Sequence, residues 1–169
     1  LSRLTPLVGR EEELGLLRRR WAQVQEGDGQ VVLLSGEAGI GKSRLMRELY
    51  EAVGSDQATH LVFRCASSAQ QSALYPVIEH LQQLVRKSGE ETPEAQCARL
   101  EQALWRVGVP VPEALSLLAA LLSLPHPEDA PPLQLSPERQ KQKTQEALIT
   151  WLVAEAAQQP VLMVWEDLH

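Results

Sequence analysis

Residues 36–43, GEAGIGKS, have the types and spacing of a phosphate-binding loop. They match the pattern G-x-x-x-x-G-K-[ST], in which glycines let successive backbone N–H groups point inward around an anion. The apolar run VVLLS at 31–35 precedes the loop, and a helical pattern follows it at 42–53. Because this motif needs a strand before it and a helix after it, the sequence predicts a site for a nucleoside triphosphate.

Each part of this loop has an expected task. The glycines permit backbone angles that a Cβ would disfavour, and the following helix presents its positive end to the anion. Lys42 is expected to supply a positive charge to the β- and γ-phosphates, and Ser43 a hydroxyl ligand for Mg²⁺. The predicted nucleotide-binding residues are Gly36, Glu37, Ala38, Gly39, Ile40, Gly41, Lys42 and Ser43.

The stretch VLMVWED at 161–167 is the candidate second half of the site. P-loop folds place the partner of Mg²⁺ and the group that orients the attacking water at the end of such an apolar strand. We predict that Glu166 lies on the metal side, through a water molecule, and that Asp167 positions the attacking water. The strand could end one residue earlier, so the division of tasks between the two carboxylates stays open.

Periodicity predicts the elements that position these residues. Continuous apolar runs indicate strands buried on both faces of a parallel sheet, and spacings of three and four indicate helices. Ser136 followed by Pro137 is a helix start. Strands are predicted at 31–35, 60–66 and 161–165, and helices at 11–25, 42–53, 72–87, 93–107, 112–124 and 137–158.

These elements predict an α/β fold, the parallel sheet of a P-loop NTPase with an inserted helical subdomain. A parallel crossover needs only a dozen or so residues, and nearly a hundred separate the second and third predicted strands. We predict the N-terminal part of the core at 1–70, the helical insertion at 71–135, and a helix with the second acidic strand at 136–169. The chain begins with Leu and ends with EDLH, which we interpret as a segment of a longer protein.

The composition of the chain argues against several classes of protein. The formal net charge is −6, which argues against a general nucleic-acid surface. Two cysteines, Cys65 and Cys97, are too few for a disulfide scaffold, and reduced thiols are expected. The four histidines lack metal-ligand spacing. The longest apolar stretch, 114–124, is about half as long as a membrane span, and no leader opens the chain, so a cytoplasmic location is expected.

Five segments in order resemble one group of AAA-like STAND ATPases, which are related to origin-recognition-type AAA modules. The resemblance covers essentially all 169 residues. It looks closest to ATPase regions attached to class III adenylate/guanylate cyclase domains, and a similar ATPase occurs in LuxR-type transcriptional activators. The segments are PLVGREEELGLL, VVLLSGEAGIGKSRL, SALYPVIEHLQQL, SPERQKQKTQEAL and PVLMVWEDLH.

The resemblance implies further site residues. It places Val8, Gly9 and Arg10 beside the adenine, whereas the residues alone indicate a helix-capping turn equally well. It implies that Arg44 either contacts phosphate or only packs. Glu166 stands where the wider P-loop class more often has Asp, which puts direct coordination of Mg²⁺ in doubt.

The resemblance also implies parts beyond His169. The family's next strand, with a polar sensor for the γ-phosphate, lies between the P-loop strand and the Walker B strand, so this segment would have a gap in its sheet. The transition-state arginine and the effector regions would also lie elsewhere. We therefore expect slow ATP hydrolysis by the full-length protein, and poor stability and little or no hydrolysis by the isolated segment.

The predicted function is an ATP-driven switch whose nucleotide state sets the output of a signalling protein, with ATP and Mg²⁺ as ligands. The predicted partners are effector domains on the same chain, or a protein bound through the ATPase. The main alternative is the ATP-sensing module of a LuxR-type regulator. A small-molecule kinase would need clustered lid arginines, but Arg86, Arg99 and Arg106 are scattered. A scaffold without nucleotide would not need Lys42 and Ser43.

Overall fold

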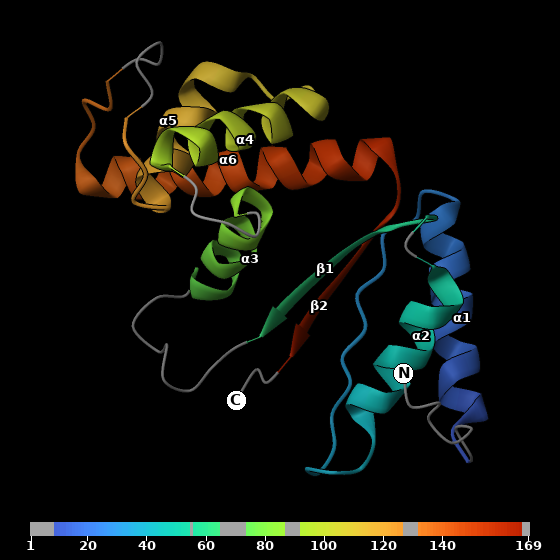
Figure 1. Ribbon diagram of the computed structural model, residues 1–169. Helices are drawn as coiled ribbons and strands as arrows, with labels where there is room; N and C mark the ends of the chain where they lie inside the picture. The colour runs from blue at the N-terminus through green and yellow to red at the C-terminus, as the bar shows by residue number, and fades with distance from the viewer. Residues whose placement is uncertain (1–8, 55, 65–73, 87–91, 127–131, 167–169) are drawn as a thin grey trace. The chain divides into compact units, whose positions relative to one another are not determined.

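The computed structural model describes residues 9–54, 56–64, 74–86, 92–126 and 132–166 of the chain (Figure 1). The chain divides into two compact units, Leu1–His60 and Leu61–His169. Among the described residues the elements, in chain order, are α1 (Glu11–Gln25), α2 (Lys42–Val53), β1 (Thr59–Arg64), α3 (Tyr75–Val85), α4 (Pro93–Arg106), α5 (Val111–Leu121), α6 (Pro137–Gln158) and β2 (Val161–Glu166).

The first unit is built on α1 packed against α2. Leu45, Leu49 and Val53 recur every four residues of α2 and are all buried, as expected for one apolar helical face. On α1 only Leu17 is buried. Both helices have the bounds that periodicity predicts, because one apolar stripe on each is enough to fix them.

The segment 31–35 is not a strand in this structure, so this prediction was wrong. It is exposed along most of its length, with Val31 fully exposed and Leu33 78% exposed. The sheet of the described residues contains only β1 and β2. An apolar run becomes a buried strand only where neighbouring strands supply hydrogen-bond partners, and 31–35 has no such neighbour here. The predicted parallel sheet therefore lacks its first strand among the described residues.

The second unit contains the small sheet, whose two strands run parallel (Figure 1). Leu61 and Phe63 of β1 and Val164 of β2 are buried. Phe63 also contacts Trp165, with ring centroids 4.5 Å apart. The predicted third strand is confirmed, and the second is confirmed as far as Arg64, because 65 and 66 lie outside the described residues.

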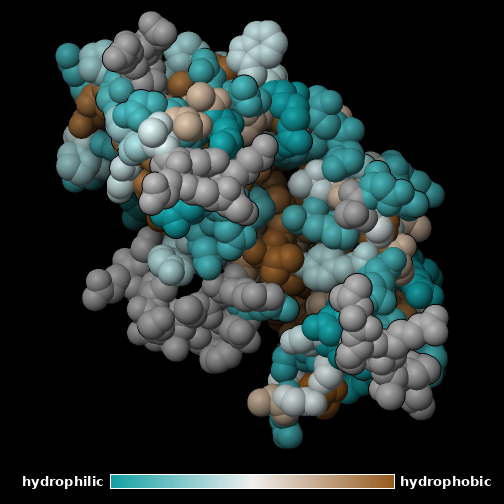
Figure 2. All heavy atoms as spheres, in the orientation of Figure 1, coloured by the Kyte–Doolittle hydropathy of each residue, from teal (hydrophilic) through white to brown (hydrophobic). Residues whose placement is uncertain are grey.

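Helices α3 to α6 enclose the main hydrophobic core of the second unit. Residues 114–119 of α5 are buried without interruption, and the helix predicted at 112–124 is confirmed as far as Leu121. On the face shown in Figure 2, hydrophilic side chains cover most of these helices. No helix of the described residues could span a membrane. The largest fully buried apolar side chains of the described residues are those of Leu81, Val85, Leu100, Leu104, Leu117 and Leu118.

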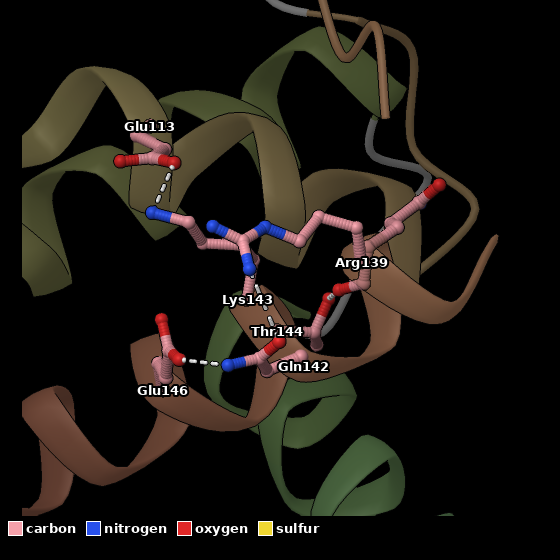
Figure 3. A network of polar contacts seen from close by, with 7 residues as sticks. Glu113, Arg139, Gln142, Lys143, Thr144 and Glu146 are labelled. Atoms are coloured by element: carbon pink, nitrogen blue, oxygen red, sulfur yellow. Dashed lines mark hydrogen bonds and ion pairs between the residues drawn. The ribbon is translucent and has the colours of Figure 1, made fainter. Parts of the chain in front are cut away.

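Helix α6 is held at its start and along its length by polar contacts. The Ser136 hydroxyl accepts the Arg139 N–H at 3.3 Å, so the predicted N-cap is confirmed. Lys143 of α6 forms an ion pair of 3.0 Å with Glu113 of α5 (Figure 3). On the exposed side of α6, Gln142 donates to Glu146 at 2.9 Å (Figure 3). Of these contacts, the ion pair between Lys143 and Glu113 joins α6 to α5.

Among the described residues of this unit, the side chain of Glu155 is the buried carboxylate. The Glu155 side chain is 6% exposed and lies 2.7 Å from the Arg106 guanidinium of α4. His80 of α3 lies between the Phe63 and Trp151 rings, with centroids 5.7 and 6.2 Å away. Burial lowers the pKa of His80, and the nearby Glu155 charge opposes that shift. A buried charge is costly unless it is paired, so Arg106 is needed to balance Glu155.

Replacing Arg106 by alanine should therefore lower the free energy of unfolding by about 2 kcal/mol, because the buried carboxylate loses its charged donor. Urea denaturation of the intact protein measures this. Arg106→Ala/Glu155→Leu should recover most of the loss, because the stranded charge is gone. Arg139→Ala, at an exposed residue of α6, is the control. An equal cost for Arg106→Ala with and without Glu155 would contradict the coupling.

Stability should also fall as the pH drops below about 6.5, the ordinary histidine value. Because the folded-state pKa of His80 is lowered, the unfolded chain binds more protons in this range, and unfolding is favoured as pH falls. His80→Gln should reduce the difference in unfolding free energy between pH 7.5 and pH 5.5. His126→Gln, at an exposed histidine, is the control. An unchanged slope in His80→Gln would refute the assignment.

Candidate functional site

The predicted phosphate loop is an exposed turn between the segment 31–35 and α2. Gly39 and Gly41 have φ angles of +79° and +99°, in the left-handed region that glycine enters without the steric cost of a Cβ. Gly41 is the N-cap of α2. Glycine therefore stands where the chain turns sharply into the helix.

The N-terminus of α2 has no side-chain cap. The Leu45 N–H donates to the Gly41 carbonyl at 3.0 Å, so the N–H groups of Lys42, Ser43 and Arg44 precede the first helical hydrogen bond. The first turn of α2 contains no acidic residue, whereas the first turns of α1, α4, α5 and α6 each contain Glu. An anion at the start of α2 would meet N–H donors and the helix dipole without a competing carboxylate.

The Lys42 ammonium is held across the loop. Its Nζ donates to the carbonyl oxygens of Gly36 at 2.8 Å and Glu37 at 2.9 Å. An ammonium has three N–H donors, so one is left for a further acceptor. The loop thus carries a positive charge whose position is set by its own backbone.

Ser43 and Arg44 begin α2 and differ in their surroundings. Ser43 is exposed, so its hydroxyl is accessible to a ligand. Arg44 forms an ion pair with Glu48, one turn further along α2, at 3.3 Å. Arg44 is thus directed along the helix in this structure, and its predicted contact with phosphate remains a prediction.

Of the three residues expected beside the adenine, Gly9 and Arg10 are described and Val8 lies outside the described residues. The Gly9 N–H donates to a Glu11 oxygen at 3.1 Å. Arg10 pairs with Glu13 through Nη1 at 2.9 Å and donates through Nη2 to the Ile40 carbonyl at 3.0 Å. The contact between Arg10 and the phosphate loop was missed at the sequence level, because it joins residues 30 positions apart.

An open hollow of about 710 Å³ lies beside α1. Three of its lining residues are glutamates, and backbone N–H groups, first its own and then that of Gly9, lower the pKa of Glu11, so this carboxyl stays charged at neutral pH. Three neighbouring carboxylates make this lining unfavourable for a polyphosphate. The hollow is lined by Gly9, Glu11, Glu12, Glu13, Leu16 and Arg19.

The predicted second half of the site lies at the end of β2, in the second unit. Glu166 is the last residue of this strand and is half-buried. Asp167 lies outside the described residues. The neighbouring Trp165 ring packs on Phe63. Because the loop and Glu166 belong to different units, their meeting around one ligand is a proposal.

The described residues contain no cluster of three or more His, Cys, Asp or Glu side chains that could hold a metal ion. Mg²⁺ is usually bound through one or two carboxylates together with substrate phosphates and water. The exposed Ser43 hydroxyl could serve as a ligand of such a nucleotide-bound ion, and the Lys42 ammonium could balance the charge of the phosphates. The residues at the loop thus fit a triphosphate with Mg²⁺.

Comparison with known proteins agrees with this geometry. The AAA ATPase domain family model matches residues 6–169. An uncharacterized protein of Rhizobium meliloti (strain 1021) is 32% identical over 170 residues, and the match covers 97% of this chain but 16% of that protein. No solved structure matches the chain. Because the family model covers the loop, α2 and β2, this chain belongs to the AAA ATPase domain family.

Proposed function

We propose that the chain is the ATP-binding part of a regulatory switch in a larger signalling protein. The observation that carries the proposal is the start of α2, where uncapped N–H groups and the tethered Lys42 ammonium face the same loop. Membership of the AAA ATPase domain family supports nucleotide binding. The match to a small fraction of a long relative is compatible with a module that acts on other domains.

In this proposal each residue acts on the bound triphosphate. The backbone N–H groups at the start of α2 bind phosphate oxygens, and Lys42 balances charge on the β- and γ-phosphates. Ser43 would hold Mg²⁺, which supplies charge neutralisation between those phosphates. Glu166 completes the metal side through water, and Asp167 orients the water that attacks the γ-phosphorus. Rate acceleration then comes from positioning and electrostatics.

ATP rather than GTP, a cytoplasmic location and a cyclase-type or LuxR-type effector are inferred from the resemblance of the motifs. A nucleotide can drive such a switch only if two conformations bind it unequally. We therefore propose that binding at the loop changes how the ATPase packs against its effector domains. The helical part of the second unit offers a surface for that coupling.

Two of the three arginines considered for a kinase lid have structural partners. Arg99 donates to the Val85 carbonyl at 2.8 Å, and Arg106 pairs with Glu155. Both contacts lie within the helical part of the second unit and stabilise its packing. These contacts favour a regulatory ATPase over a small-molecule kinase.

Replacing Lys42 by alanine should weaken Mg·ATP binding roughly 10- to 100-fold, as expected for loss of a charge-assisted hydrogen bond. Isothermal titration of the intact protein measures the change. Lys141→Ala, at an exposed lysine of α6, is the matched control and should bind as the parent does. Equal affinities of the parent and Lys42→Ala for Mg·ATP would refute the proposed site.

A second experiment should distinguish the roles of the Glu166 and Asp167 carboxylates. Glu166→Gln should raise the Mg²⁺ concentration needed for half-maximal ATP binding, because the metal side loses a charge. Asp167→Asn should leave binding unchanged and slow single-turnover hydrolysis by roughly 100-fold or more, within the range that general-base catalysis contributes. Glu146→Gln on α6 is the control. Exchanged phenotypes would exchange the two roles, and two unaffected variants would refute both.

A further inference from the structure

Arg10 connects the start of α1 to the end of the phosphate loop. It is the N-cap residue of α1, and its Nη2 donates to the Ile40 carbonyl at 3.0 Å. Its Nη1 is held by the Glu13 carboxylate, 2.9 Å away on the next turn. The guanidinium is therefore positioned by two groups. One is the Glu13 carboxylate on α1, and the other is the Ile40 carbonyl of the loop.

The contact with the Ile40 carbonyl determines how the peptide between Ile40 and Gly41 is oriented. The peptide bond between Ile40 and Gly41 is planar and trans, so its C=O and N–H groups point in opposite directions. When Arg10 holds the carbonyl, the Gly41 N–H must point away from the guanidinium. That N–H belongs to the N-cap residue of α2, at the end of the loop where the backbone donors for an anion begin.

Little else orders this end of the loop among the described residues. Gly39 and Gly41 on either side of Ile40 have left-handed backbone angles that glycine leaves easily. The turn bond from the Ile40 N–H to the Glu37 carbonyl is long, at 3.4 Å. Lys42 fixes the opposite end through the Gly36 and Glu37 carbonyls. Arg10 is the side-chain contact that fixes the Ile40–Gly41 end.

We propose that Arg10 is a positioning residue for the phosphate loop, which orients the Ile40–Gly41 peptide for the triphosphate of the nucleotide. This inference rests on the proposed function. It differs from the role implied by the resemblance, in which Arg10 helps to bind the adenine. The two roles predict different ligand dependence, because inorganic tripolyphosphate has no base.

Isothermal titration of the intact protein with Mg·ATP and with Mg·tripolyphosphate tests the proposal. Arg10→Ala should lower both affinities by the same factor, roughly tenfold for one charge-assisted hydrogen bond. Arg10→Lys should restore part of the loss, because an ammonium can still donate to the Ile40 carbonyl. Glu13→Gln should weaken binding of both ligands less than Arg10→Ala does, and Glu12→Gln, at the adjacent exposed glutamate, is its matched control.

Hydrogen exchange followed by mass spectrometry separates positioning from general destabilisation. In Arg10→Ala without ligand, amide exchange should become faster at 36–44 and stay unchanged in the later turns of α2, at 46–53. Faster exchange throughout α1 and α2 would show that Arg10 only stabilises the fold, and would overturn the proposal. If Arg10→Ala does not fold, Arg10→Lys and Glu13→Gln carry the same comparison.

The other possible results of the titrations also distinguish between the two roles of Arg10. A loss of ATP affinity with tripolyphosphate affinity unchanged would overturn the proposal and assign Arg10 to the base. Unchanged affinity for both ligands would show that the contact with Ile40 has no effect on binding. Failure of the parent protein to bind either ligand would instead refute the proposed function, and Lys42→Ala, measured in parallel, identifies that case.

Discussion

The exposed N-terminus of α2 is the constraint on which the site depends. A helix starts with N–H groups that its own backbone cannot satisfy, and most helices of this chain meet that need with a side-chain cap or glutamates in the first turn. Helix α2 has Gly41, Lys42 and Ser43 at its start instead. Its N–H donors and its dipole are thus available to a ligand, and a bound anion would supply the negative charge that glutamates supply in the first turns of α1, α4, α5 and α6.

Backbone carbonyls contact two of the positively charged side chains at the loop. Lys42 donates to two carbonyls and Arg10 to a third. A carbonyl is a neutral acceptor, so the two contacts of Lys42 fix where its charge lies and leave much of its positive potential for an anion. Arg10 and Arg44 differ because Glu13 and Glu48 pair with them. The loop therefore combines ordered geometry with a net attraction for phosphate.

The strand that bears Glu166 depends on a different part of the molecule. Helix α6 ends at Gln158 and β2 begins at Val161, so the position of α6 determines where β2 starts. Trp151 on α6 is part of the main hydrophobic core of the second unit, and the buried Glu155 is paired with Arg106 of α4. The packing of the helical core therefore helps to place the acidic end of β2.

Local sequence determined the elements whose formation depends on neighbouring residues in the chain. The bounds of α1 and α2, the Ser136 cap and the buried character of α5 follow from periodicity and capping chemistry, and the structure agrees. The glycines and Lys42 of the loop were identified in the same way. Helical hydrogen bonds join residues four apart, so a window of sequence contains nearly all the information that a helix needs.

Only the tertiary structure decided the pairing between distant segments. Residues 31–35 have the composition of a buried strand, but strand formation needs partners that the run itself does not specify, and no strand in the described part of the chain pairs with it. The contacts of Arg10 with Ile40 and of Arg106 with Glu155 span 30 and 49 residues. Sequence periodicity cannot predict these contacts, because they arise from the packing of whole helices and loops rather than from local backbone geometry.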